Sequence, residues 1–179
     1  MVRKLIEEFV SEPSGGERGL AVVAAFFETV RERFGIYQEI RRGVINAADA
    51  ATRSAADLEC VGPNGNVVLA VEVKERRIGD DDLHIAIAKA RELEIHELIF
   101  CSEGIVTSQR EQALMTIQNA WASGTNIYQT TPRELIRDVL PIAGEVGTKA
   151  FIIHVGEQLD KFNTQPRHRK AWKAPLDSL

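Results

Sequence analysis

Four charged residues in the middle of the chain have types and spacing suited to metal-assisted chemistry: Asp57, Glu59, Glu72 and Lys74. The segments that carry them, 55–61 and 67–75, are predicted strands because both are rich in apolar and β-branched residues. Side chains alternate between the two faces of a strand, so Asp57 shares a face with Glu59, and Glu72 shares a face with Lys74. The opposite faces carry residues suited to a protein core, Leu58, Cys60, Val71 and Val73.

The sequence Gly62-Pro63-Asn64-Gly65-Asn66 between the two strands predicts a tight hairpin turn. A two-residue loop at Asn64-Gly65 would place Asp57 opposite Glu72, with Cβ atoms roughly 5 Å apart. The same register would place Lys74 opposite Ala55 and Glu59 opposite Ala70. A turn centred on Pro63-Asn64 slips the register by two and keeps the charged faces together. A three-residue turn with a bulge at Gly65 disturbs the alternation locally.

Two opposed carboxylates repel each other and destabilise a sheet, so their placement requires a reason. A hard divalent cation such as Mg²⁺ between them supplies one, because it binds carboxylate oxygens and water. Lys74, one pleat further on, could hold or deprotonate a metal-bound water, or stabilise negative charge on a phosphate. Alternating charge is also typical of a solvated strand face, but the run before Glu72, VVLAV, is strongly apolar. These residues therefore predict hydrolysis of a phosphodiester.

The pattern A-D57-L-E-C followed by V-E72-V-K74 resembles the PD-(D/E)XK nuclease motif, with Ala56 at the position of its proline. The wider stretch RRGVINAADAATRSAADLEC…VVLAVEVKER is similar to the SacI-type family of type II restriction endonucleases, as are FFETVRERFG and QPRHRKAW. The resemblance implies that Asp57 and Glu72 ligate Mg²⁺, that the backbone carbonyl of Val73 adds a ligand, and that Lys74 assists the attacking water. Mn²⁺ is expected to substitute. Glu28 in the first predicted helix and Glu59 are candidates for a further ligand.

The function expected from this resemblance is a Mg²⁺-dependent endonuclease that hydrolyses DNA at a specific double-stranded site. Cleavage of both strands needs two active sites, which favours a homodimer on a palindromic sequence. Two alternatives stay open, a structure-specific repair or recombination nuclease of the same fold and a non-catalytic DNA-binding module. We expect a single nuclease domain over 1–179. The chain is short for a complete restriction enzyme, which leaves open that it is the catalytic part of a longer protein.

The remaining elements predict an α/β fold. Further strands are expected at 36–40, 97–101 and 126–129, and helices at 20–33, 83–93, 108–121, 132–140 and 146–162. Late strands that alternate with helices favour parallel pairing, whereas the hairpin is antiparallel. The expected architecture is therefore a mixed β-sheet flanked by helices, as in restriction endonucleases.

Two further segments could contact phosphates or bases. The stretch 161–173 contains no acidic residue and five basic ones, Lys161, Arg167, Arg169, Lys170 and Lys173, with His168 and Trp172 among them. Arg41, Arg42 and Arg53 flank the loop NAADAATRS, in which Asn46 and Asp49 carry side chains suited to base edges. A solvated tail and a simple surface loop explain these segments equally well.

The composition sets limits on the class of protein. The formal net charge of −4, with 44% apolar residues, excludes a disordered tail and a disulfide scaffold. Cys60 and Cys101 lie in apolar runs and are expected to be buried, reduced thiols, which favours the cytoplasm. The longest apolar stretch, Leu20–Phe27, is far shorter than a membrane span, so no membrane partner is expected. The four histidines lack zinc-ligand spacing with the cysteines.

Overall fold

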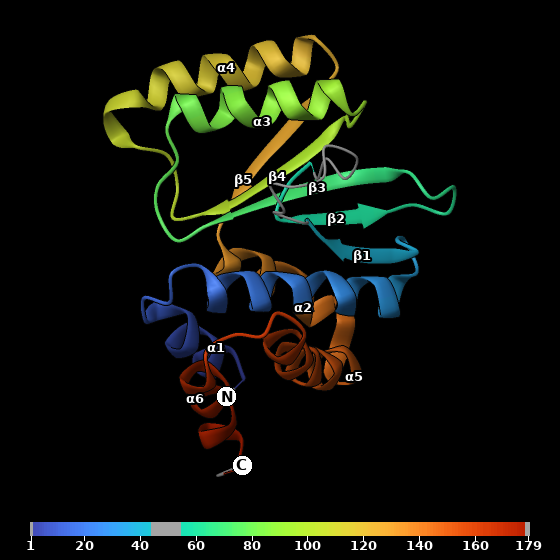
Figure 1. Ribbon diagram of the computed structural model, residues 1–179, viewed down its shortest axis with the longest axis vertical. Coiled ribbons are helices and arrows are strands. Elements are labelled where there is room, and N and C mark those ends of the chain that lie inside the picture. Colours follow the sequence, from blue (N-terminus) through green and yellow to red (C-terminus); the bar gives the residue numbers. More distant parts are fainter. Residues whose placement is uncertain (1, 44–54, 178–179) are drawn as a thin grey trace. The chain divides into compact units, whose positions relative to one another are not determined.

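A computed structural model describes residues 2–43 and 55–177, and the chain divides into two compact units (Figure 1). The sheet unit spans Tyr37–Thr131, and the helical unit combines Met1–Ile36 with Pro132–Leu179. The candidate loop residues Asn46, Asp49 and Arg53 lie outside the described residues.

A five-stranded mixed sheet forms the centre of the sheet unit. Its strands lie in the order β1-β2-β3-β4-β5, with the bounds Glu39–Arg42, Leu58–Val61, Val67–Lys74, Glu97–Ser102 and Asn126–Thr130. The first three strands pair antiparallel, and β3, β4 and β5 pair parallel. This arrangement confirms the predicted combination of an antiparallel hairpin with parallel strands later in the chain.

Two helices, α3 (Asp80–Glu92) and α4 (Arg110–Ala122), connect the parallel strands and lie along one face of the sheet (Figure 1). A parallel pair needs such a crossover, and the right-handed twist of strands places successive crossovers on the same side. A short 3₁₀ helix, Thr107–Gln109, precedes α4. The core between these helices and the sheet is apolar and includes Ala70, Leu83, Ala86, Ile87, Leu98, Phe100 and Ala113. The predicted α/β fold class is confirmed.

The helical unit contains α1 (Val2–Ser11), α2 (Glu17–Phe34), α5 (Pro132–Lys161) and α6 (Pro166–Leu176). Gly35 ends α2 with a left-handed φ of 66°, the conformation that glycine commonly adopts after a helix. Gly144 interrupts α5 with a φ of 69° and non-helical backbone, so α5 consists of two helices that meet at a kink, as predicted. By length and composition alone α5 could cross a membrane. Its side chains Phe151 and Val155 are buried, whereas Ile142, Val146 and Ile153 are exposed.

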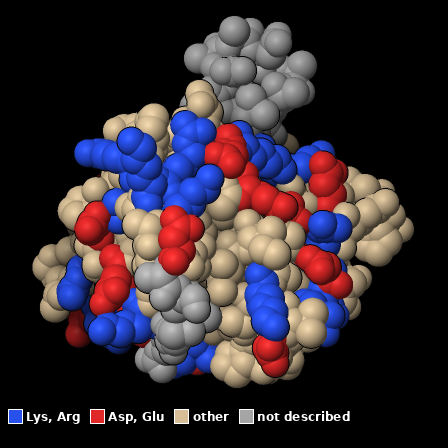
Figure 2. Space-filling model, turned by 90° about the horizontal axis from the view of Figure 1, so that it is seen from below, with Lys and Arg blue, Asp and Glu red and all other residues tan. Residues whose placement is uncertain are grey.

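The basic segment 161–173 has a buried side and an exposed side. His168 and Trp172 are buried, and the Trp172 ring packs edge-on against Phe9 with ring centroids 5.0 Å apart. These two residues therefore hold α6 in place rather than contact a partner. Arg167 and Lys170 are exposed, whereas Arg169 pairs with Asp160 at 3.2 Å. Figure 2 shows Lys and Arg interspersed with Asp and Glu on the face seen from below.

Arg18 is the centre of a buried polar cluster in the helical unit, and we expect its loss to destabilise the fold. Its Nε donates to His168 Nδ1 at 2.8 Å, and its Nη1 donates to the Phe9 carbonyl at 2.9 Å. Replacing Arg18 with alanine leaves these buried acceptors without their donor. The free energy of unfolding should fall by about 3 kcal/mol in urea denaturation.

Arg169→Ala is the matched control, because it removes a largely solvated ion pair with Asp160. Its cost should stay below about 1 kcal/mol. Equal losses in the two variants would contradict the role assigned to Arg18.

Candidate active site

The hairpin turn contains three residues, Pro63, Asn64 and Gly65, rather than two. The Gly65 N–H donates to the Gly62 carbonyl at 3.0 Å, and the Gly62 N–H donates to Asn66 at 2.9 Å. Gly65 has a φ of 78°, the left-handed conformation that a bulge at this position requires. The two-residue loop is therefore wrong, and the three-residue alternative is correct.

A second irregularity restores the register that the turn disturbs. Val61 pairs with Val67, but Cys60 pairs with Leu69, so Val68 is an extra residue on β3. Beyond it Glu59 lies opposite Ala70, as predicted, and Leu58 lies opposite Val71. Continuing this register places Asp57 opposite Glu72.

The limits of β1 and β2 differ from the predicted ones. Arg41 and Arg42 lie inside β1 rather than in a turn after it, because pairing with β2 continues as far as Leu58. Asp57 immediately precedes β2, although its carbonyl still accepts the Gly43 N–H at 2.8 Å. The backbone of Asp57 is thus held from the β1 side.

The structure brings Asp57, Glu72 and Lys74 together at the end of β3. Asp57 Oδ2 accepts the backbone N–H of Val73 at 2.8 Å and lies 3.4 Å from Lys74 Nζ. Lys74 Nζ donates to Glu72 Oε2 at 2.7 Å. One ammonium group therefore contacts both carboxylates, and the Val73 amide orients one of them.

Partial burial strengthens the electrostatics of this cluster. The side chains of Glu72, Asp57 and Lys74 are 12%, 22% and 30% exposed. Burial acts to lower the pKa of Lys74, but the hydrogen bond to Glu72 and the charges of Glu72 and Asp57 outweigh it and raise that pKa above its ordinary value. In the chain without a metal, Lys74 is therefore a cation held between two carboxylates.

Two further residues lie near this cluster, and the alternation along the two predicted strands does not identify either of them. Ser102 is fully buried and is the register partner of Lys74 on β4. Asp82 accepts the Gly79 N–H at 2.8 Å and pairs with Arg76. The hydrogen bond from Arg76 lowers the pKa of Asp82 against the effect of burial, and the Gly79 N–H and the charges of Arg76 and Lys74 lower it further.

The other candidate residues lie elsewhere or have other partners. Glu59 lies two residues after Asp57, and its Oε1 accepts the Ala55 N–H at 2.8 Å. Glu28 belongs to α2 of the helical unit and pairs with Arg31 at 2.7 Å. Val73 lies between Glu72 and Lys74 on β3. The roles of Glu28, Glu59 and Val73 as metal ligands stay predictions.

The donor set fits a hard cation that keeps several of its waters. Within residues 2–43 and 55–177, no group of three or more His, Cys, Asp and Glu side chains has the arrangement of a metal site. Asp57 and Glu72 nevertheless converge on one positively charged group. Mg²⁺ is commonly held by one or two carboxylates together with water, and these two oxygen donors meet that requirement.

Comparison with known proteins identifies the family to which the chain belongs. No curated protein matches the chain. The model of the SacI restriction endonuclease C-terminal domain matches residues 1–104, which include Asp57, Glu72 and Lys74 and exclude the basic segment 161–173. Because this match covers more than half of the 179 residues, the chain belongs to the family of SacI restriction endonuclease C-terminal domains.

Proposed function

We propose that the chain is a Mg²⁺-dependent endonuclease that cuts double-stranded DNA at a specific site. Membership in a restriction endonuclease family indicates a hydrolase that acts on DNA. The observation that carries the finer proposal is the convergence of Asp57 and Glu72 on Lys74 Nζ, at 3.4 and 2.7 Å. Two carboxylates in contact with one ammonium group are suited to binding a cation and an anionic phosphate side by side.

Each residue of the cluster has a distinct part in this proposal. Asp57 and Glu72 would hold the metal, with the carbonyl of Val73 as a further ligand and Mn²⁺ as a substitute ion. When bound, Mg²⁺ would polarise the scissile phosphate and lower the pKa of a coordinated water. Lys74 would donate to the attacking water or to a phosphate oxygen and stabilise the negative charge that develops there. The Val73 N–H keeps the Asp57 carboxylate oriented.

The proposal extends to assembly and compartment. Cleavage of both strands requires two active sites, so we propose a homodimer on DNA. Cys60 and Cys101 are buried and are not joined in a disulfide, which supports a reducing cytoplasm. We also propose that the protein has no membrane partner, because its longest unbroken apolar run, Leu20–Phe27, is much shorter than a membrane span.

Incubation with plasmid DNA tests the proposal directly. We expect the chain to linearise the plasmid in Mg²⁺ or Mn²⁺ and to leave it intact in EDTA. Sequencing of the ends should return one palindromic site. Cleavage confined to branched DNA would indicate a repair or recombination nuclease instead. DNA binding without calorimetric Mg²⁺ or Mn²⁺ binding would indicate a non-catalytic module.

A further inference from the structure

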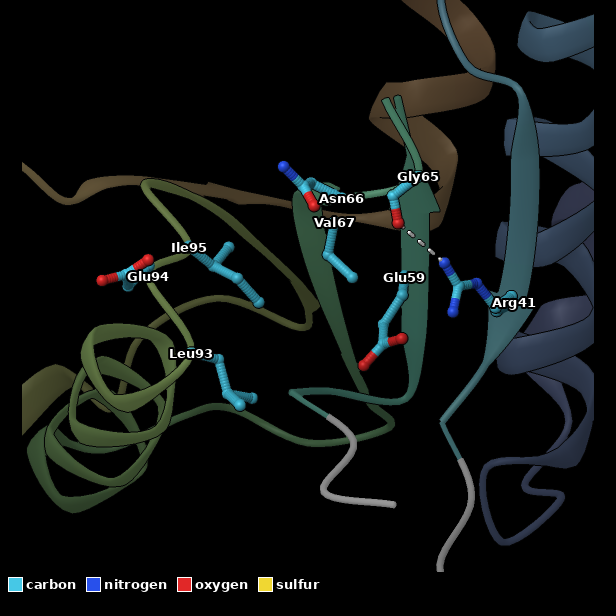
Figure 3. Close-up of a pocket in the computed structure, with 8 residues that line it drawn as sticks. All are labelled: Arg41, Glu59, Gly65, Asn66, Val67, Leu93, Glu94 and Ile95. Atoms are coloured by element: carbon cyan, nitrogen blue, oxygen red, sulfur yellow. Dashed lines mark hydrogen bonds between the residues drawn. The ribbon is translucent and has the colours of Figure 1, made fainter. Parts of the chain in front are cut away.

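The sheet unit contains a hollow next to the hairpin turn between β2 and β3. It has a volume of about 390 Å³ and is lined by Arg41 of β1, Glu59 of β2, the hairpin residues Gly65, Asn66 and Val67, and Leu93, Glu94 and Ile95 after α3 (Figure 3). Sites for small organic molecules have volumes of about 300–1,000 Å³. We call this hollow the hairpin pocket.

One side of the hairpin pocket is apolar, and the other presents a donor beside an acceptor. Val67, Leu93 and Ile95 form the apolar side. Arg41 and Glu59 are direct register partners across β1 and β2, so a guanidinium group and a carboxylate start from neighbouring positions. This combination suits a flat apolar ring whose edge carries both a hydrogen-bond donor and an acceptor.

The two charged side chains make contacts that orient them. Glu59 Oε1 accepts the Ala55 N–H at 2.8 Å. Arg41 extends towards the turn, and its Nη2 donates to the Gly65 carbonyl at 3.4 Å (Figure 3). The Arg41 Nε is buried and makes no hydrogen bond within the described part of the chain, although it lies 3.2 Å from Glu39 Oε2.

Glu59 of the hairpin pocket lies on β2, and Asp57 of the candidate active site immediately precedes that strand. Glu59 and Asp57 are two residues apart, a separation of roughly 7 Å along an extended chain. A group that contacts Glu59 is therefore about as far from a phosphate bound near Asp57 as one nucleotide is from the next along a DNA strand. This proximity points to part of the same DNA strand as the occupant.

We propose that the hairpin pocket binds an unpaired guanine base of the DNA substrate. The base would pack against Leu93 and Ile95. The Glu59 carboxylate would accept its N1–H and N2–H, and Arg41 would donate to O6. Guanine offers two adjacent donors next to one acceptor, whereas adenine and cytosine place a single donor beside ring acceptors. A concave pocket admits the base only after it leaves the stack. The assignment of the base to DNA rests on the proposed nuclease function.

Binding of free guanosine to the whole chain tests the pocket without requiring cleavage. In NMR titrations we expect guanosine to shift the signals of Leu93 and Ile95, and adenosine and cytidine to bind more weakly. Glu59→Gln keeps an acceptor for the Ala55 N–H but presents amide hydrogens to the base, so guanosine affinity should fall about tenfold or more. Arg41→Gln should weaken binding too, and Glu111→Gln, an exposed carboxylate on α4, should change nothing.

The binding and cleavage experiments test the guanine-pocket proposal and the proposed nuclease function separately. Plasmid cleavage without guanosine binding would overturn the pocket assignment and leave the nuclease standing. Guanosine binding without plasmid cleavage would overturn the proposed nuclease function and leave the pocket assignment standing. Equal binding of the three nucleosides, or unchanged affinity in both folded variants, would also overturn the assignment. In sequenced cleavage ends, the wild type should show a preference for guanine near the cut, and Arg41→Gln should lose that preference.

Discussion

Replacing Asp57 with asparagine is expected to lower the rate of Mg²⁺-dependent DNA cleavage by about 1000-fold or more. That factor corresponds to about 4 kcal/mol of transition-state stabilisation, the scale expected for one charged ligand of a catalytic metal. The asparagine keeps an oxygen that can accept the Val73 N–H, which Asp57 Oδ2 accepts at 2.8 Å. The variant therefore removes the charge and leaves the local hydrogen bond in place. Single-turnover cleavage of a plasmid at saturating enzyme measures the loss.

The control for Asp57→Asn is Asp138→Asn, a carboxylate on α5 that is 59% exposed and pairs with Arg137. This variant should cleave at the wild-type rate. Calorimetry should show weaker Mg²⁺ binding in Asp57→Asn alone. A rate within about tenfold of wild type would exclude Asp57 as a metal ligand.

The register of the hairpin could be predicted only in part. Glu59 lies opposite Ala70 as expected, although the two-residue loop behind that expectation is wrong. The bulge at Gly65 shifts the pairing by one, and the extra residue Val68 shifts it back. The first bulge has a signal in Pro-Asn-Gly, but Val68 has none, because its place in the pairing depends on the partner strand.

The helices of the helical unit show where periodicity alone is insufficient. Gly35 and Gly144 mark helix breaks that follow from the special backbone of glycine. Helix α6 was not predicted, because its buried residues, His168 and Trp172, are scattered among basic residues. Their burial depends on Arg18 and Phe9, which are about 150 residues away in the chain. Contacts at such separations cannot be read from local spacing.

The grouping of Asp57, Glu72 and Lys74 could be predicted from the sequence, whereas the residues around them could not. Alternation along two strands was sufficient to group Asp57, Glu72 and Lys74. Asp82 joins their electrostatic environment because α3 begins close to the end of β3, an arrangement that follows from the crossover rather than from residue spacing. Asp80, Asp81 and Asp82 form the acidic first turn of α3, and only the fold relates Asp82 to Lys74.

Replacing Lys74 with methionine is expected to slow cleavage by about 100- to 10,000-fold, the range for a positioned group that donates to reacting atoms. Methionine retains much of the side-chain volume and removes the ammonium group. In EDTA the same change leaves Glu72 and Asp57 facing each other without the cation that now lies 2.7 and 3.4 Å from them. Their repulsion should lower the free energy of unfolding by about 1–2 kcal/mol in urea.

Mg²⁺ separates these two effects of Lys74→Met. A bound dication would offset the repulsion, so Mg²⁺ should stabilise the variant more than the wild type while leaving its cleavage slow. Lys149→Met is the control, since Lys149 pairs with Glu145 on α5 and both side chains are more than 70% exposed. It should cleave and unfold as the wild type does. If Lys74→Met cleaves at the wild-type rate, Lys74 serves only to hold the two carboxylates together before the metal binds.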